Sequence, residues 1–193
     1  DYKIKIIDAS DSSIYKESDE FTISEKSIAV TEPTSSTVWY KGDSAEITWT
    51  SNGTISDVKI DLYKGGTFNQ TIVSSTTNDG SYTWAEVDAL LVDGTEYKVR
   101  VSSTADSGLY GESDEFAIEE KSITVTEPTS STIWTKGKSE DIIWTFVGTI
   151  SDVKIDLYKG SNLSETIISN TENDGSYTWS DVNQNIVDGS DYK

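Results

Sequence analysis

The chain of 193 residues contains no cysteine, no histidine and no methionine. Without cysteine it can form no disulfide and offers no thiolate to a metal ion or a substrate, which favours a prokaryotic source. Without cysteine and histidine, catalysis would need paired carboxylates, a serine–lysine pair or a metal held by oxygen ligands. Most acidic residues instead follow the pattern of a solvated face. We predict a protein that is not an enzyme, with no catalytic residues, no metal site and no cofactor.

Long apolar runs and basic residues are also scarce. No stretch is apolar enough to span a membrane, and no signal peptide is visible. The 34 Asp and Glu outnumber the 15 Lys and Arg, which gives a net charge of −19. Such a surface repels phosphate backbones and anionic lipid heads, so we expect no nucleic-acid partner and no membrane insertion of this segment. Because methionine is absent, the sequence does not begin at a natural initiator and is expected to be an excerpt of a longer polypeptide.

The apolar residues that are present belong to the types that favour β-strands. Twenty Ile and 13 Val stand against six Leu, and they are accompanied by 24 Thr and ten Tyr. β-Branched and aromatic side chains fit the half-buried surface of a pleated sheet. This composition predicts an all-β protein.

An internal repeat organises the whole chain. When the sequence is shifted by 95 residues it aligns with itself without a gap, and 47 of 72 positions are identical between 27–98 and 122–193. The tripeptide Asp-Tyr-Lys at 1–3 returns as Glu-Tyr-Lys at 96–98 and again as Asp-Tyr-Lys at 191–193. A period of this length suits a whole small domain rather than a solenoid unit.

The phase of the repeat predicts three segments. Residues 1–26 would be the last two strands of one repeat, 27–121 a complete repeat, and 122–193 a repeat that lacks its last strands. Either the native polypeptide is longer and the sequence is cut within a domain, or the first strands of one chain complete the last domain of the next chain. Both alternatives remain open at this point.

Within one repeat, short alternating segments are separated by turn signals about every ten residues. This spacing predicts a Greek-key β-sandwich of immunoglobulin (Ig) type with about seven strands, repeated in tandem. The expected strands are 27–32, 45–50, 57–64, 71–76, 81–87, 96–103 and 114–119. Four tryptophans are expected at the centres of the two cores, namely Trp49, Trp84, Trp144 and Trp179. The junction at 116–128 has no glycine and no serine-rich spacer, so we expect a stiff connection between repeats.

Three motifs of the second repeat carry a resemblance to a known family. They are ITVTEPTSSTIWTKG at 123–137, VKIDLYKG at 153–160 and GSYTW at 175–179. In this order they resemble the domain of the Ser/Thr-rich GPI-anchored membrane family, which also forms the Ig-like N-terminal part of yeast proteins of β-1,6-glucan assembly. The resemblance implies an extracellular Ig-like module of cell-wall or surface proteins, often found in tandem. It transfers fold positions only: Pro33, Gly42, Trp49, Leu62, Tyr82, Trp84, Tyr97 and Phe116.

The sequence offers two candidate kinds of binding site, and in each case the alternative is an ordinary solvated surface. Tyr63 and Tyr158 fall on the outward phase of their strands and are candidates for stacking against sugars. The acidic clusters at 17–20 and 112–115, near Glu32, could supply oxygen ligands for calcium, although no Asp-x-Asp-x-Asp-Gly loop is present.

Three asparagines begin Asn-x-Ser/Thr sequences and are candidate glycosylation sites: Asn52, Asn69 and Asn162. Together with the repeat, these features favour a structural segment of an extracellular or cell-surface fibre, stalk or adhesin shaft. Its partners would be further copies of the same repeat, head to tail. The alternative is a polysaccharide-binding module of a cell-wall or surface protein.

Overall fold

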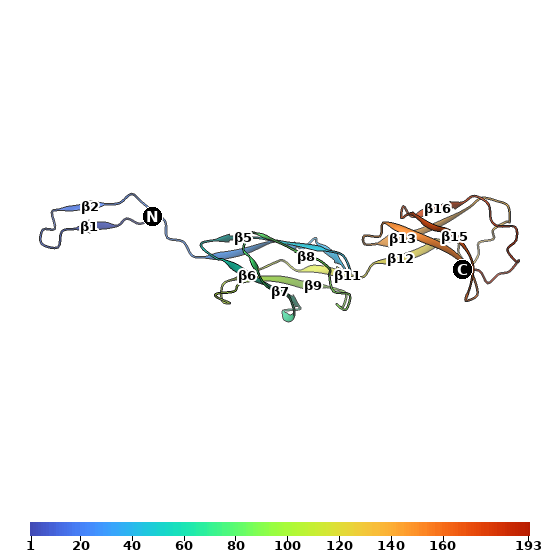
Figure 1. Cartoon of the computed structure of the whole chain (residues 1–193), viewed down its shortest axis with the longest axis horizontal. Coiled ribbons are helices and arrows are strands. Elements are labelled where there is room, and N and C mark those ends of the chain that lie inside the picture. The colour runs from blue at the N-terminus through green and yellow to red at the C-terminus, as the bar shows by residue number, and fades with distance from the viewer. The chain divides into compact units, whose positions relative to one another are not determined.

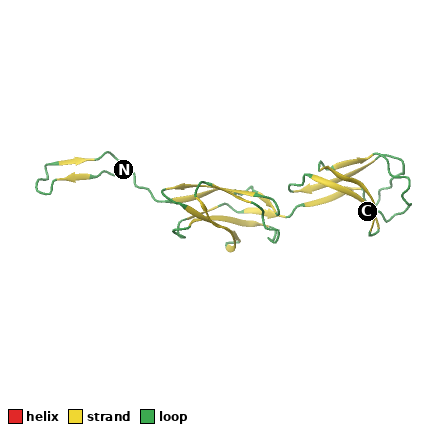
Figure 2. Cartoon of the chain, in the orientation of Figure 1, coloured by secondary structure: helices red, strands yellow, loops and turns green.

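A computed structural model describes residues 1–193, and every regular element in it is a strand (Figure 2). The strands are numbered β1 to β16 along the chain. The all-β fold class predicted from the Ile, Val and Thr content is therefore confirmed. No helix long and apolar enough to cross a membrane is present. The strands form one hairpin and two β-sandwiches, and each is described by itself.

The first sandwich consists of two sheets. The smaller sheet has the strand order β3-β5-β8, and the larger has the order β4-β11-β9-β6-β7, with β10 paired to β9. Figure 1 shows β5 and β8 stacked over β6, β7 and β9. The strands are β3 (Ser27–Glu32), β4 (Val38–Tyr40), β5 (Ala45–Asn52), β6 (Asp57–Lys64), β7 (Thr67–Thr77), β8 (Ser81–Trp84), β9 (Gly94–Ser103), β10 (Tyr110–Glu112) and β11 (Phe116–Glu119).

This sandwich has nine strands where the sequence predicted about seven. The two additional ones, β4 and β10, are three residues long, which is too short for a period-two pattern to be visible in the sequence. Strand β7 begins at Thr67 instead of Thr71, because it continues directly from the two-glycine turn that joins it to β6. The extra residues lengthen existing sheets and leave the Ig-type arrangement unchanged.

Alternation places the core as expected on the central strands. Val58, Ile60 and Leu62 of β6 are fully buried, and Tyr97 of β9 packs beside Phe116 with ring centroids 6.2 Å apart. Burial of side chains of this size contributes on the order of 2 kcal/mol each to folding. The alternating residues of β9, Val99 and Val101, complete this layer with no exposed surface.

The tryptophans differ in their burial. Trp49 is 3% exposed, Trp144 5% and Trp179 8%, and all three lie in sandwich interiors. Trp84 is only half-buried, since it ends strand β8.

The second sandwich has a three-stranded sheet, β12-β13-β16, and a two-stranded sheet, β14-β15. Its strands are β12 (Ser122–Glu127), β13 (Glu140–Val147), β14 (Asp152–Lys159), β15 (Asn162–Glu172) and β16 (Ser176–Trp179). The pairing of β14 with β15 repeats the three register shifts of β6 with β7, each displaced by 95 residues. The core consists of Ile142, Trp144, Leu157, Trp179 and Val182.

One edge of the second sandwich is only partly paired. In the first sandwich β6 has β7 on one side and β9 on the other, whereas β14 has β15 alone and a single bridge from Lys159 to Tyr192. Ile123 of β12 is 48% exposed, while Ile28, its counterpart in β3, is 6% exposed. Strand β10, which lies against β3 at Ile28 in the first sandwich, has no counterpart among residues 122–193.

The N-terminal residues form the hairpin of β1 (Lys5–Ile7) and β2 (Tyr15–Glu17), extended by a bridge between Tyr2 and Phe21. Every residue of both strands is exposed. The hairpin is thus a two-stranded ribbon with no core of its own.

Candidate functional site

The outer face of the larger sheet carries an arginine between two aromatic rings. Strand register places Tyr63 of β6 beside β9, and β10 brings Tyr110 alongside. The guanidinium carbon of Arg100 lies 4.2 Å from the ring centroid of Tyr63 and 4.4 Å from that of Tyr110. Its Nη1 donates to the Tyr63 hydroxyl at 2.8 Å, while Nε and Nη2 donate to Glu112 Oε1 at 2.9 and 2.6 Å. Three of the five N–H donors of the guanidinium are used in these bonds.

The electrostatics of this cluster favour the charged arginine. Partial desolvation lowers the pKa of Arg100, but the hydrogen bond to Glu112 and electrostatic interactions with Tyr63, Glu112 and Tyr110 outweigh it, and the net pKa is raised. The guanidinium therefore stays charged and holds β9 to β10. This arrangement requires no ligand.

The two tyrosines predicted to stack on sugars occupy different surroundings. The ring of Tyr63 is covered by Arg100 on one face and meets the ring of Phe68 edge-on with centroids 5.9 Å apart, and the residue is half-buried. The ring of Tyr158, its counterpart, is 38% exposed. At equivalent positions of the two repeats, the ring of Tyr63 is therefore covered on one face, whereas Tyr158 is accessible.

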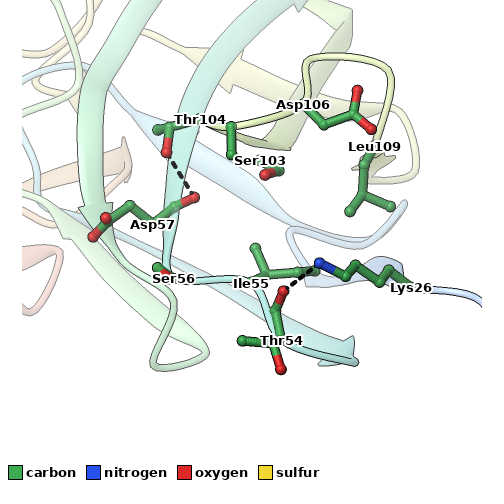
Figure 3. A pocket seen from close by; sticks show the side chains of 10 residues that line it. Lys26, Thr54, Ile55, Ser56, Asp57, Ser103, Thr104, Asp106 and Leu109 are labelled. Atoms are coloured by element: carbon green, nitrogen blue, oxygen red, sulfur yellow. Dashed lines mark hydrogen bonds between the residues drawn. The ribbon is translucent and has the colours of Figure 1, made fainter.

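A shallow cavity of about 340 Å³ lies at one end of the first sandwich, between 54–57 and 103–109 (Figure 3). Lys26 reaches across it and donates from Nζ to the carbonyl of Thr54 at 2.7 Å. Thr104 donates from Oγ1 to the carbonyl of Asp57 at 3.2 Å. These polar groups satisfy one another, so they offer no convergent donors to a ligand.

The acidic clusters do not converge on a metal site. No group of three Asp or Glu side chains is arranged to hold an ion. Glu112 is bound to Arg100, Glu115 lies 4.0 Å from Lys98, and Glu20 lies 3.7 Å from Lys3. Glu32 accepts a hydrogen bond from the hydroxyl of Thr37 at 3.2 Å. These four carboxylates are distributed among separate cations and a hydroxyl.

The three candidate glycosylation asparagines are all exposed. Asn69 lies on β7 and Asn162 begins β15, so both sit in the same hairpin of their repeats. Asn52 uses its amide nitrogen as a donor to Ser24 Oγ at 3.1 Å and to the carbonyl of Glu25 at 2.8 Å. A glycan on Asn52 would replace one of these hydrogens, whereas Asn69 and Asn162 form no such bonds.

Two asparagines that sequence reasoning did not single out anchor the core tryptophans. Trp49 Nε1 donates to Asn78 Oδ1 at 2.7 Å, and Asn78 Nδ2 donates to Ser51 Oγ at 2.9 Å and to the carbonyl of Ile55 at 3.0 Å. In the second sandwich, Trp144, Asn173 and Ile150 repeat the bonds to the indole and to the carbonyl, while Phe146 stands in place of Ser51. The available signal was the repeated NDGSYTW motif, whose asparagine stands 29 residues after each tryptophan.

A buried carboxylate on the central strand was also missed. Asp61 is 5% exposed, lies 2.9 Å from Lys59 Nζ, and accepts a hydrogen bond from Thr71 Oγ1 at 2.7 Å. The equivalent contacts in the second sandwich involve Asp156, Lys154 and Thr166. Hydrogen bonds from Lys154 and then Thr166 lower the pKa of Asp156.

The comparisons with known proteins agree with this fold. The profile of the Kre9/KNH-like N-terminal Ig-like domain matches residues 32–118 and 127–193. The chain belongs to this family and contains two segments of it in tandem. A search of curated proteins gave no significant match.

Three solved structures are among those to which the chain shows similarity. Fibronectin(III)-like modules of Clostridium thermocellum CbhA share 15% identity, with 80% of this chain and 79% of that chain covered and a TM-score of 0.31. A tetra-tandem repeat from the extending region of a large adhesion protein shares 20%, with 91% and 46% covered and a TM-score of 0.32. A chimeric titin Z1Z2 tandem shares 17%, with 81% and 86% covered and a TM-score of 0.28.

Proposed function

We propose that this chain is a structural, non-catalytic segment of an extracellular or cell-surface fibre, stalk or adhesin shaft. In it, Ig-like domains follow one another head to tail as a stiff rod, through covalent continuation or strand complementation. The observation that carries the proposal is the gapless 95-residue repeat of an Ig-like domain whose interior is filled by its own side chains. Strands of about eight residues plus end loops would advance such a rod by roughly 35–45 Å per domain.

The short connection between repeats supports the stiffness. Only Glu120 and Lys121 separate β11 from β12. Lys121 Nζ lies 2.5 Å from Asp43 Oδ1 and 3.5 Å from the carbonyl of Thr149. A linker of two residues whose second side chain is bound at two points has little conformational freedom.

Small-angle scattering of the 193-residue chain tests the stiffness. The matched control carries four flexible residues, Gly-Gly-Ser-Gly, inserted between Glu120 and Lys121. We expect the wild type to show a narrower distribution of interatomic distances than the insertion variant. Indistinguishable scattering from the two proteins would contradict a stiff rod.

The surface location has a separate test. Antibodies against the 27–121 segment should decorate fibres or stalks on intact source cells in immunogold electron microscopy. Label confined to the cell interior would refute this part of the proposal. Peptide mapping of the native protein by mass spectrometry would also show whether Asn69 and Asn162, rather than Asn52, carry glycans.

The alternative is binding of a surface polysaccharide, and it rests on the accessible ring of Tyr158. Aromatic faces of this kind can stack against sugar rings. A glycan array would show binding that Tyr158→Ala abolishes, while Tyr63→Ala, at the covered ring, serves as the comparison. Binding that both variants retain, or no binding at all, would remove this alternative.

A further inference from the structure

The chain enters the first sandwich at one end and leaves it at the other (Figure 1). At the entry, Ser27 of β3 pairs with Asn52, the last residue of β5. At the exit, the carbonyl of Glu119 accepts a hydrogen bond from the amide of Lys41 at 3.0 Å, and Lys41 lies four residues before β5 begins. Because β5 spans eight residues, the two points are separated by the length of a strand, about 23 Å. Tension applied to the chain on both sides of this sandwich therefore runs along its strands.

The exit strand β11 runs parallel to its neighbour β4. The amide of Ala117 donates to the carbonyl of Thr37 at 3.2 Å, and the amide of Lys41 donates to the carbonyl of Glu119 at 3.0 Å. Residue numbers thus rise in the same direction along both strands. Strand β4 follows β3 and is pulled from its N-terminal end, whereas β11 is pulled from its C-terminal end. Parallel strands pulled in this way slide past each other, and their hydrogen bonds bear the force together.

An antiparallel pair that is pulled at its open end responds differently. The hairpin of β6 and β7 has such an end at the pair Asp57 and Thr77. Force applied there separates the strands one bond at a time, so each bond carries the whole load in turn. Strand β7 is also the edge strand of its sheet, with β6 as its neighbour on one side only. The same sandwich therefore has a resistant direction and a weak direction.

The segment between β3 and β4 is held in place, and the bonds between β4 and β11 are shielded. Thr37 Oγ1 donates to Glu32 Oε2 at 3.2 Å and accepts a hydrogen bond from the amide of Thr34 at 3.0 Å. Trp39 of β4 and Ile118 of β11 are 7% and 0% exposed. Water therefore has little access to the backbone bonds between the two strands and cannot easily replace them when they are stretched.

We propose that the first sandwich is a load-bearing domain, in which β4 and β11 form a shear clamp against tension along the chain. This mechanical role goes beyond the proposed function, because a stiff spacer need not resist tension. If β3 separates from β5 first, the load passes to β4 and the clamp still holds. The chain continues on both sides of the clamp, through residues 1–26 and 122–193, so tension can reach it from either side.

Single-molecule pulling on the full chain tests the direction of resistance. Because the chain has no cysteine, pairs of introduced cysteines can attach handles at chosen points under reducing conditions. Glu25→Cys with Glu120→Cys loads the clamp in shear and leaves the second sandwich outside the loaded segment. Asp57→Cys with Thr77→Cys loads β6 and β7 from their open end. All four altered side chains are exposed, so both variants should keep the fold.

The two cysteine pairs have different expected outcomes. The rupture force of the shear pair should be at least about twofold higher, because at least two backbone bonds share the load. Rupture of the clamp should extend 95 residues from a folded span of roughly 40 Å to about 330 Å. The other pair should yield at lower force and release only the short segment between its handles.

A substitution at the end of the clamp tests the bonds themselves. The amide of Asp43 donates to the carbonyl of Tyr40 at 3.0 Å, and Gly42 has a φ of 81°, which is the pattern of a type II turn. Lys41 occupies the second position of this turn, where proline is favoured. Lys41→Pro should therefore fold while losing the amide that bonds Glu119.

Lys41→Ala is the matched control. It loses the same side chain, including the ion pair with Asp93, and keeps the amide. At equal force Lys41→Pro should unfold about five times faster than Lys41→Ala, because forced unfolding follows the unfolding rate and one clamp bond is missing. Chemical denaturation should show a much smaller difference, since proline also restricts the unfolded chain. A purely structural effect would change both measurements alike.

The inference is overturned if the shear pair ruptures at a force equal to or below that of the other pair, or if Lys41→Pro and Lys41→Ala unfold at the same rate under load. The cysteine pairs leave the clamp residues unaltered, so they decide the question even if Lys41→Pro does not fold. The scattering and labelling experiments on the shaft do not depend on the clamp. Failure of the clamp and failure of the proposed function are therefore distinguishable.

Discussion

The bond between the core tryptophan and its asparagine yields the sharpest prediction for stability. Asn78→Ala removes the acceptor of the Trp49 indole N–H, and this donor is then buried without a partner at 3% exposure. An orphaned buried donor costs about 1–3 kcal/mol. The variant also loses the two amide bonds to Ser51 and Ile55, which water can partly replace at about 0.5 kcal/mol each. The expected total is about 2–4 kcal/mol.

For a domain of this size, 1 kcal/mol corresponds to about 4–8 °C, so the melting transition of the first sandwich should fall by about 8–30 °C. Differential scanning calorimetry of the full chain measures this change. Asn173→Ala, in the same network of the second sandwich, is the matched control and should shift only the transition of that sandwich. The pair of variants thereby assigns the two transitions.

A double-mutant cycle with Trp49→Phe isolates the indole contribution, because phenylalanine has no N–H to leave unpaired. In that background Asn78→Ala should cost less, by about 1–3 kcal/mol. A loss below about 1 kcal/mol in the wild-type background, or an equal loss in both backgrounds, would refute the argument that the asparagine acts through the tryptophan.

Three further variants test other contacts. Gly111→Ala should destabilise the first sandwich by about 1–3 kcal/mol, because its Cβ would meet the carbonyl of Ile28 at 2.5 Å and force β10 away from β3. Asp156→Asn should flatten the acid side of the stability profile of the second sandwich. The hydrogen bond from Lys154 lowers the pKa of Asp156, so its stabilising effect is present above the ordinary value of 3.8 and is lost as pH falls through the lower folded-state value. Arg100→Lys should cost about 1 kcal/mol by urea unfolding, because lysine keeps the charge but loses the planar stacking and the forked bonds.

Controls for these variants come from the same elements. Gly108→Ala meets only the side chain of Asp106, which can move, and should be tolerated. Asp152→Asn removes an exposed carboxylate from the same strand as Asp156 and is the charge-matched control for that variant. Equal effects of either control and its test variant would contradict the assigned contact, as would an Arg100→Lys protein as stable as the wild type.

The sequence by itself determined the all-β class, the 95-residue period and the identity of most core positions. These features are local or periodic: alternation along β6 already separates Val58, Ile60 and Leu62 from the outward residues, and a gapless repeat needs no structure to be seen. Family membership likewise follows from motif order, which the profile match bears out.

Only the tertiary structure decided which side chains meet across strands. Arg100 stacks on Tyr63, which is 37 residues away in the sequence, because the strand register brings the two side chains together. A slip of one residue would turn the side chains of the shifted strand to the opposite face of the sheet. The same holds for the bond from Trp49 to Asn78 and for the short strands β4 and β10, whose pairing is imposed by neighbours rather than by their own three residues. The 95-residue period also aligned residues 1–26 with residues 96–121. The structure added that aligned positions differ in burial, since Ile6 is 74% exposed and Val101, 95 residues later, is fully buried. Apolar burial is a property of assembled sheets and not of single strands.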